Sequence, residues 1–82
     1  MPTVLRIGGF EVIIRLPPRE HGPPHVHVFK AGGRVIINLP DAEQPRSVRK
    51  VVHMREPDIA LAIRLVERHE EYLMSVWRRL HD

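Results

Sequence analysis

The chain has 82 residues and no cysteine, so it can build one hydrophobic core and has no disulfide, thiolate metal site or thiol nucleophile. Thirteen Lys and Arg against ten Asp and Glu give a formal charge of +3, which permits an acidic partner, protein or nucleic acid, without choosing between them. No stretch approaches the roughly 20 apolar residues that a membrane helix needs. We therefore expect a single domain over residues 1–82, cytoplasmic and without membrane contact.

Alternating apolar and polar residues predict four or five antiparallel strands in the first two-thirds of the chain. The expected ranges are about 3–7, 10–16, 25–30, 34–39 and 48–54. Gly8-Gly9 and Gly32-Gly33 fit two-residue hairpin turns between neighbouring strands. Four prolines and a glycine fall within residues 17–24, which predicts a loop there, because proline cannot donate a ladder hydrogen bond.

The last third of the chain carries apolar residues at helical spacing and predicts one long helix over about 57–80. Glu56-Pro57-Asp58 suits its start, and Arg78 and Arg79 suit its end, because these charges complement the helix dipole. Tyr72 and Trp77 are expected in the core, and the glutamates at 67, 70 and 71 in solvent. The expected fold class is α+β, a four- to five-stranded antiparallel sheet packed on one long C-terminal helix.

Side chains alternate along a strand, so the predicted sheet has two different faces. One face is apolar and is the expected core: Phe10, Val12, Ile14, Leu16, Val26, Val28, Val35, Ile37 and Leu39. The opposite face carries Glu11, Ile13, Arg15, His25, His27, Phe29, Arg34, Ile36 and Asn38. Because one helix covers only one side of a sheet, this second face meets water, a small ligand or another chain. Its apolar patch predicts a partner surface made by Ile13, Arg15, Phe29 and Ile36.

The histidines in EHGPPHVHVF allow three interpretations. First, His25 and His27 point to the same side of a strand and could bind zinc or nickel with His21 or His53, although the sequence requires no cofactor. Second, His25 and His27 could transfer protons while Arg34 stabilises negative charge, as a metal-independent ribonuclease site requires. Third, they could simply keep an exposed strand edge soluble. Whether the protein is an enzyme stays open.

The start MPTVLRIGGF, the string PPHVHV at residues 23–28 and a helix ending around Trp77 resemble a family of small bacterial proteins known as domain of unknown function 4160. Genes of that family often lie beside a second small gene, in an arrangement similar to toxin–antitoxin pairs. The resemblance therefore implies a small protein partner encoded by the adjacent gene. Self-association as a homodimer and a toxin that acts on nucleic acid are the alternatives.

Overall fold

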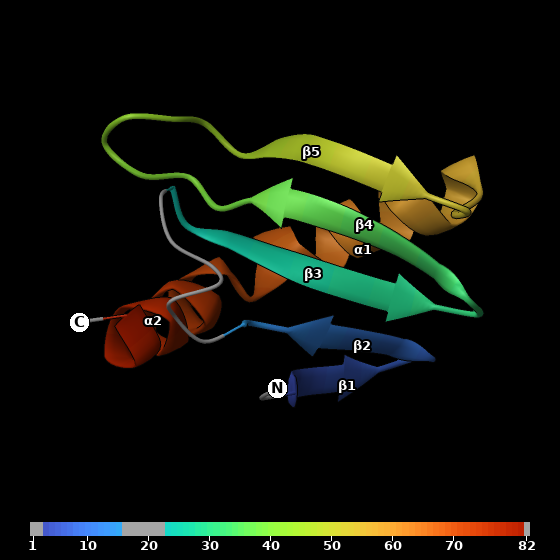
Figure 1. Ribbon diagram of the computed structural model, residues 1–82, viewed down its shortest axis with the longest axis horizontal. Coiled ribbons are helices and arrows are strands. Elements are labelled where there is room, and N and C mark those ends of the chain that lie inside the picture. The colour runs from blue at the N-terminus through green and yellow to red at the C-terminus, as the bar shows by residue number, and fades with distance from the viewer. Residues whose placement is uncertain (1–2, 16–22, 82) are drawn as a thin grey trace.

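Five antiparallel strands form the sheet of the computed structural model, which describes residues 3–15 and 23–81. They are β1 (Thr3–Ile7), β2 (Phe10–Ile13), β3 (His25–Lys30), β4 (Gly33–Asn38) and β5 (Ser47–Val52), and their order across the sheet is their order along the chain (Figure 1). The α+β prediction is confirmed. Three strands end earlier than predicted, β2 at Ile13, β4 at Asn38 and β5 at Val52. β5 ends there because His53 has a left-handed φ of 52°.

Both hairpins turn on residues with positive φ. Gly8 and Gly9 have φ values of 55° and 84°, which suits the tight turn that a two-residue hairpin requires. In the second hairpin the turn residues are Ala31 and Gly32, one position earlier than predicted. Gly33 already belongs to β4, and glycine is required there for a different reason. A Cβ at this position would clash with the carbonyl group of His53, approaching its carbon to 2.8 Å.

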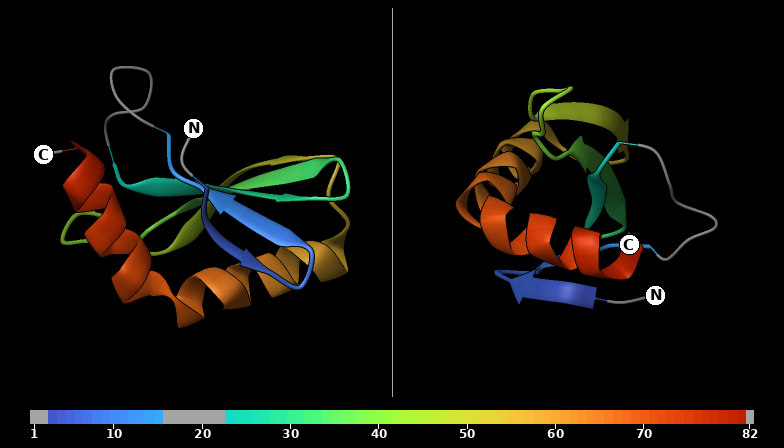
Figure 2. Two further views of the ribbon diagram at one scale, coloured as in Figure 1. Left: turned by 90° about the horizontal axis from the view of Figure 1, so that it is seen from below. Right: turned by 90° about the vertical axis from the view of Figure 1, so that its left-hand side faces the viewer.

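The prediction of one long C-terminal helix is wrong. The chain forms α1 (Glu56–Arg68) and α2 (Glu70–His81), and His69 between them has a non-helical φ of −112°. Figure 2 shows α1 lying along one face of the sheet, whereas α2 turns away from the axis of α1 and continues past the end of the sheet. Arg68 ends α1 with a positive charge and Glu70 opens α2 with a negative one, so each charge complements the dipole at its own helix terminus.

Arg46, in the connection between β4 and β5, joins the two helices at this bend. Its guanidinium group pairs with Glu70 at the start of α2 and lies 3.4 Å from the carboxylate of Glu67 on α1. The hydrogen bond to Glu70 raises the pKa of Arg46, so the cation persists at every ordinary pH. Glu67 is exposed, as expected, whereas Glu70 is half-buried. Through Arg46, both glutamates connect the segment between β4 and β5 to the helices on either side of the bend.

The predicted core face is confirmed for the residues that the structure describes. Its buried members are Phe10, Val12, Ile14, Val26, Val28, Val35, Ile37 and Leu39, and Leu16 lies outside the described residues. α1 contributes Ala62 and Val66 to this core, and α2 contributes Leu73, Val76 and Trp77. Tyr72 was expected in the core but is exposed, and its hydroxyl donates a hydrogen bond to the Val4 carbonyl, 3.2 Å away.

Neither helix in the described part of the chain is long and apolar enough to cross a lipid bilayer.

Candidate functional site

The two histidines of β3 lie side by side at the end of the sheet where α2 passes. Their ring centroids are 5.4 Å apart, and the side chains of His25 and His27 are only 2% and 4% exposed. We expected both to point away from the helix. His25 instead has its ring centroid 5.2 Å from that of Trp77 on α2, because the bend at His69 carries α2 past the sheet end (Figure 2).

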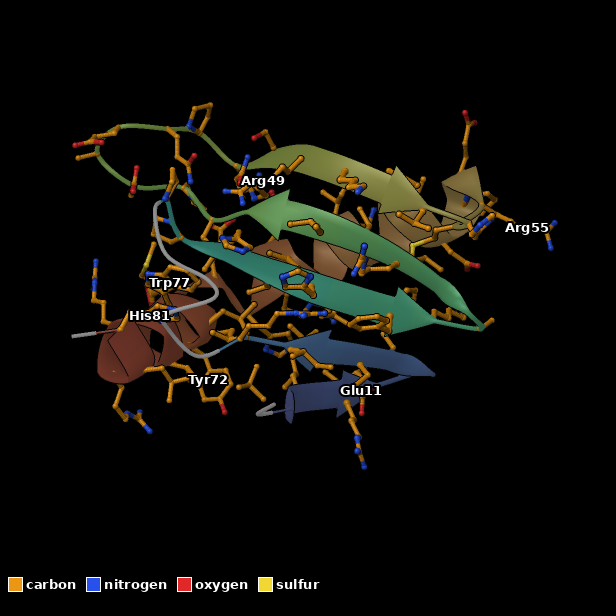
Figure 3. The ribbon with its side chains drawn as sticks, viewed as in Figure 1. Glu11, Arg49, Arg55, Tyr72, Trp77 and His81 are labelled. Carbon is orange, nitrogen blue, oxygen red and sulfur yellow. The ribbon has the colours of Figure 1, made fainter. Side chains whose placement is uncertain are left out.

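A second imidazole extends this contact toward the surface. The ring of His81 stacks on Trp77 with centroids 3.7 Å apart and planes 13° from parallel. Figure 3 shows Trp77 and His81 together near the end of α2. We call His27, His25, Trp77 and His81 the ring cluster; it runs from the buried His27 to the half-buried His81.

Hydrogen bonds to the backbone define the tautomers of two of these histidines. The Nδ1 atom of His25 lies 3.0 Å from the Pro23 carbonyl oxygen, and that of His81 lies 3.0 Å from the Trp77 carbonyl oxygen. A carbonyl oxygen only accepts, so Nδ1 carries the hydrogen in both rings. In the neutral form the lone pair is therefore on Nε2, the atom that can accept a proton or coordinate a metal ion.

Pro24, directly before His25, is held by the connection between β4 and β5. The Pro24 carbonyl accepts hydrogen bonds from the Leu39 amide at 2.9 Å and from the Gln44 side chain at 3.2 Å. Gln44 also donates to the Leu39 carbonyl, and Asp41 closes the same loop through the Gln44 amide. The entry into β3 is thus fixed in direction. Gln44 was missed from sequence, because nothing distinguishes it from other polar loop residues.

His53 lies far from the strand histidines. Strand register pairs Arg34 with Val52, so His53 lies beyond one end of β4. His25 pairs with Asn38 and His27 with Ile36, which places His53 roughly 16 Å along the strands from His25 and roughly 10 Å from His27, with β4 between them, at 3.3 Å per residue. The remaining candidate ligand, His21, lies outside the described residues. Across residues 3–15 and 23–81, no three His, Cys, Asp or Glu side chains converge as metal ligands. Zinc or nickel binding through His25 and His27 stays a prediction.

Arg34, the third candidate catalytic residue, shares a sheet face with both histidines but lies near only one of them. His27 is directly opposite Ile36, so Arg34 is its diagonal neighbour, about 7–8 Å away between Cα atoms. His25 lies two further positions along β3. A catalytic arrangement therefore favours His27 and Arg34 over His25 and Arg34.

The sheet side that faces away from α1, which we call the open face, has a partly accessible apolar centre. Two rows of cross-strand neighbours follow from the register: Ile13, His27, Ile36 and Lys50, then Glu11, Phe29, Arg34 and Val52. Ile13 is buried and offers little contact area, whereas Phe29 and Ile36 are half-buried, as is Arg15 beyond the end of β2. Val52, which sequence reasoning did not single out, extends the apolar centre between the cations Arg34 and Lys50.

A sequence model of one protein family, described as a domain of unknown function (DUF4160), matches residues 9–78. The matched range includes PPHVHV, all of α1 and α2 as far as Arg78. No curated protein and no solved structure is similar enough to match the chain.

Proposed function

The chain belongs to the family of domain of unknown function 4160 (DUF4160), and on that premise we propose that it is a protein-interaction module, one half of a two-gene pair of the toxin–antitoxin type. Its open face binds the small cognate protein encoded by the adjacent gene. The observation that carries this proposal is the pair Phe29 and Ile36, half-buried at the centre of a sheet face that lies opposite α1 (Figure 2).

The composition of the open face supports a protein partner. Apolar side chains at the centre of a surface supply most of the free energy of association, and aromatic residues are frequent among the strongest contributors. The neighbouring cations Arg34 and Lys50 suit a partner that carries carboxylates around an apolar anchor. Single apolar residues are common on a water-exposed sheet face, but adjacent ones such as Phe29 and Ile36 on β3 and β4 are typical of an interaction site.

Substitution of Phe29 tests this proposal. We expect Phe29→Asp to weaken binding of the adjacent gene product by about thirtyfold or more, equivalent to about 2 kcal/mol, because an anchor is lost and a charge is desolvated. Val51→Asp is the matched control. Val51 is also an apolar strand residue, although more exposed than Phe29, and it pairs with Val35, so it lies on the helix side of the sheet. Affinity is measured by calorimetry with the copurified partner.

Thermal unfolding of each variant shows whether it is folded. If Phe29→Asp does not fold, Ile36→Lys replaces it, since the long lysine side chain can extend from this half-buried position and keep its charge in solvent. A folded variant that binds the partner with wild-type affinity contradicts the proposal. Sedimentation of the protein alone distinguishes self-association: a homodimer that Phe29→Asp dissociates assigns the open face to a second copy instead.

A second candidate function, a ribonuclease using His25 and His27, is favoured by the adjacency of the two rings and the defined tautomer of His25. It ranks below binding because both side chains are buried. Purified protein is incubated with RNA, with and without added zinc or nickel. Cleavage lost in His25→Ala and His27→Ala but kept in His69→Ala, a half-buried histidine at the helix bend, supports the enzyme. Intact RNA under all conditions excludes it.

A further inference from the structure

A groove lies on the helix side of the sheet, between the β1–β2 hairpin and α1. Its volume is about 390 Å³. α1 lines it with Leu61, Arg64, Leu65 and Arg68, which recur at i, i+3, i+4 and i+7 and therefore share one face of the helix. None of these residues belongs to the ring cluster or to the open face.

The floor of the groove is apolar and partly accessible. Ile7 from β1 and Leu61 from α1 are 43% and 48% exposed, which makes them two of the most exposed large apolar side chains among the described residues. Gly8 lies beside them at the hairpin, and with no side chain it leaves the mouth of the groove open. Two exposed aliphatic side chains lining one hollow mark a binding surface more often than isolated ones do.

The rim of the groove is cationic. Lys30 is fixed at one side, with its ammonium group 3.2 Å from the Asp58 carboxylate and 4.6 Å from the centroid of the Phe10 ring. Arg64 and Arg68 are exposed, and neither forms an ion pair with any residue that the structure describes. No carboxylate lines the groove in the described part of the chain. Arg68 also borders a neighbouring hollow that carries Glu67, Glu70 and Glu71, whereas no carboxylate shares a hollow with Arg64 there.

We propose that this groove binds an acidic peptide segment of a partner protein, with a leucine-sized side chain seated on Ile7 and Leu61 and flanking carboxylates paired with Arg64 and Arg68. The groove lies on the opposite side of the sheet from the open face, so this inference stands independently of the proposed function. Helical peptides bind grooves in this way through side chains one turn apart.

Other occupants fit the groove less well. Small molecules are bound in sites that bury most of their surface, whereas Ile7 and Leu61 leave this groove half open to solvent. Single-stranded nucleic acid needs accessible aromatic rings for stacking, but Phe10 is buried beneath Lys30. A symmetric contact with a second copy would bring Arg64 and Arg68 against the same arginines, which like-charge repulsion disfavours.

The test uses a fluorescein-labelled peptide of about fourteen residues, glutamate throughout except for two leucines one helical turn apart. Its binding to the full chain is followed by fluorescence anisotropy, and its site by amide chemical shifts. We expect Arg64→Gln with Arg68→Gln to weaken binding at least about tenfold, and Leu61→Ser to do the same. Raising NaCl from about 0.05 M to about 0.5 M should also weaken binding, because exposed charges are screened.

The matched control is Arg78→Gln with Arg79→Gln, which removes the same charge from exposed positions of α2 and should change the affinity less than about twofold. A peptide with serines in place of its leucines should bind at least about tenfold more weakly, which separates seating on the floor from charge attraction alone. The proposal is overturned if the two double variants lose the same affinity or if the peptide does not bind. It is also overturned if octanoate, as a small molecule, or oligo-dT, as a single-stranded nucleic acid, binds more tightly than the peptide and shifts the same amides.

Discussion

Replacing Trp77 by alanine should lower the free energy of unfolding substantially. Trp77 is 6% exposed, stacks on His81 at 3.7 Å and lies 5.2 Å from His25. Truncating a buried tryptophan costs about 3–5 kcal/mol, and this range includes the stacking of the indole on neighbouring rings. A chain of 82 residues has about 4–12 kcal/mol of stability in total, from 0.05–0.15 kcal/mol per residue. The variant is thus expected to lose about a quarter or more of its free energy of unfolding.

Urea denaturation followed by far-ultraviolet circular dichroism measures this loss, since the substitution removes the one tryptophan on which a fluorescence assay depends. Tyr72→Ala is the matched control on the same helix. Tyr72 is exposed and makes one hydrogen bond to the Val4 carbonyl, so its truncation should cost about 1 kcal/mol or less. If Trp77→Ala costs no more than Tyr72→Ala, the ring cluster does not hold α2 against the sheet.

Two further substitutions test the backbone contacts. Gly33→Ala should lower the free energy of unfolding by about 1–3 kcal/mol in the same urea assay, because the new Cβ clashes with the backbone of His53; wild-type stability would show that the turn after β5 yields freely. Gln44→Leu should cost about 1–3 kcal/mol in thermal unfolding, since the Pro24 and Leu39 carbonyls lose a side-chain donor. No change in melting temperature would mean that water replaces Gln44 there without cost.

Most of the sheet could be predicted because alternation along a strand directly reports burial. Val26, Val28 and Val35 follow the predicted period of two and have no exposed surface. Burial departs from this period in β3, where His25 and His27 are buried as well. The errors in the strand and turn boundaries fall where alternation ends. A left-handed residue at position 53 stops β5, and a turn on Ala31 shifts the second hairpin by one residue. Neither position carries glycine or asparagine, the residues from which a positive φ is usually predicted.

The bend between the helices could not be predicted from hydrophobic spacing, because the apolar stripe continues through it. The available signal was electrostatic: Arg68 followed by Glu70 reverses the charge order expected within one helix. This error propagated to the site. With a straight helix, we expected His25 to lie on the sheet face away from the helix. The bend instead brings Trp77 of α2 next to His25. His25 and His27 were therefore found from sequence as a pair, but Trp77 and His81 were not recognised as their neighbours.

The metal prediction depended on a distance that sequence spacing does not contain. His53 follows directly after β5. The pairing of β5 with β4 shows at which end of the sheet His53 lies. The same register rows identify Val52 as a neighbour of Arg34 on the open face. Pairing between strands, rather than the composition of either strand, decides which side chains meet.

The sheet order, identical to the chain order, has a consequence for how the protein is made. Every strand pairs with its immediate predecessor, so the sheet needs no contact between distant segments and can form quickly. α2 is different, because Tyr72 reaches back over 68 positions to β1. During synthesis the strands emerge first, and their apolar side faces water until the last third of the chain leaves the ribosome. In that interval the nascent sheet is prone to aggregation, and a truncation that removes α2 would permanently expose the part of the core that Leu73, Val76 and Trp77 cover.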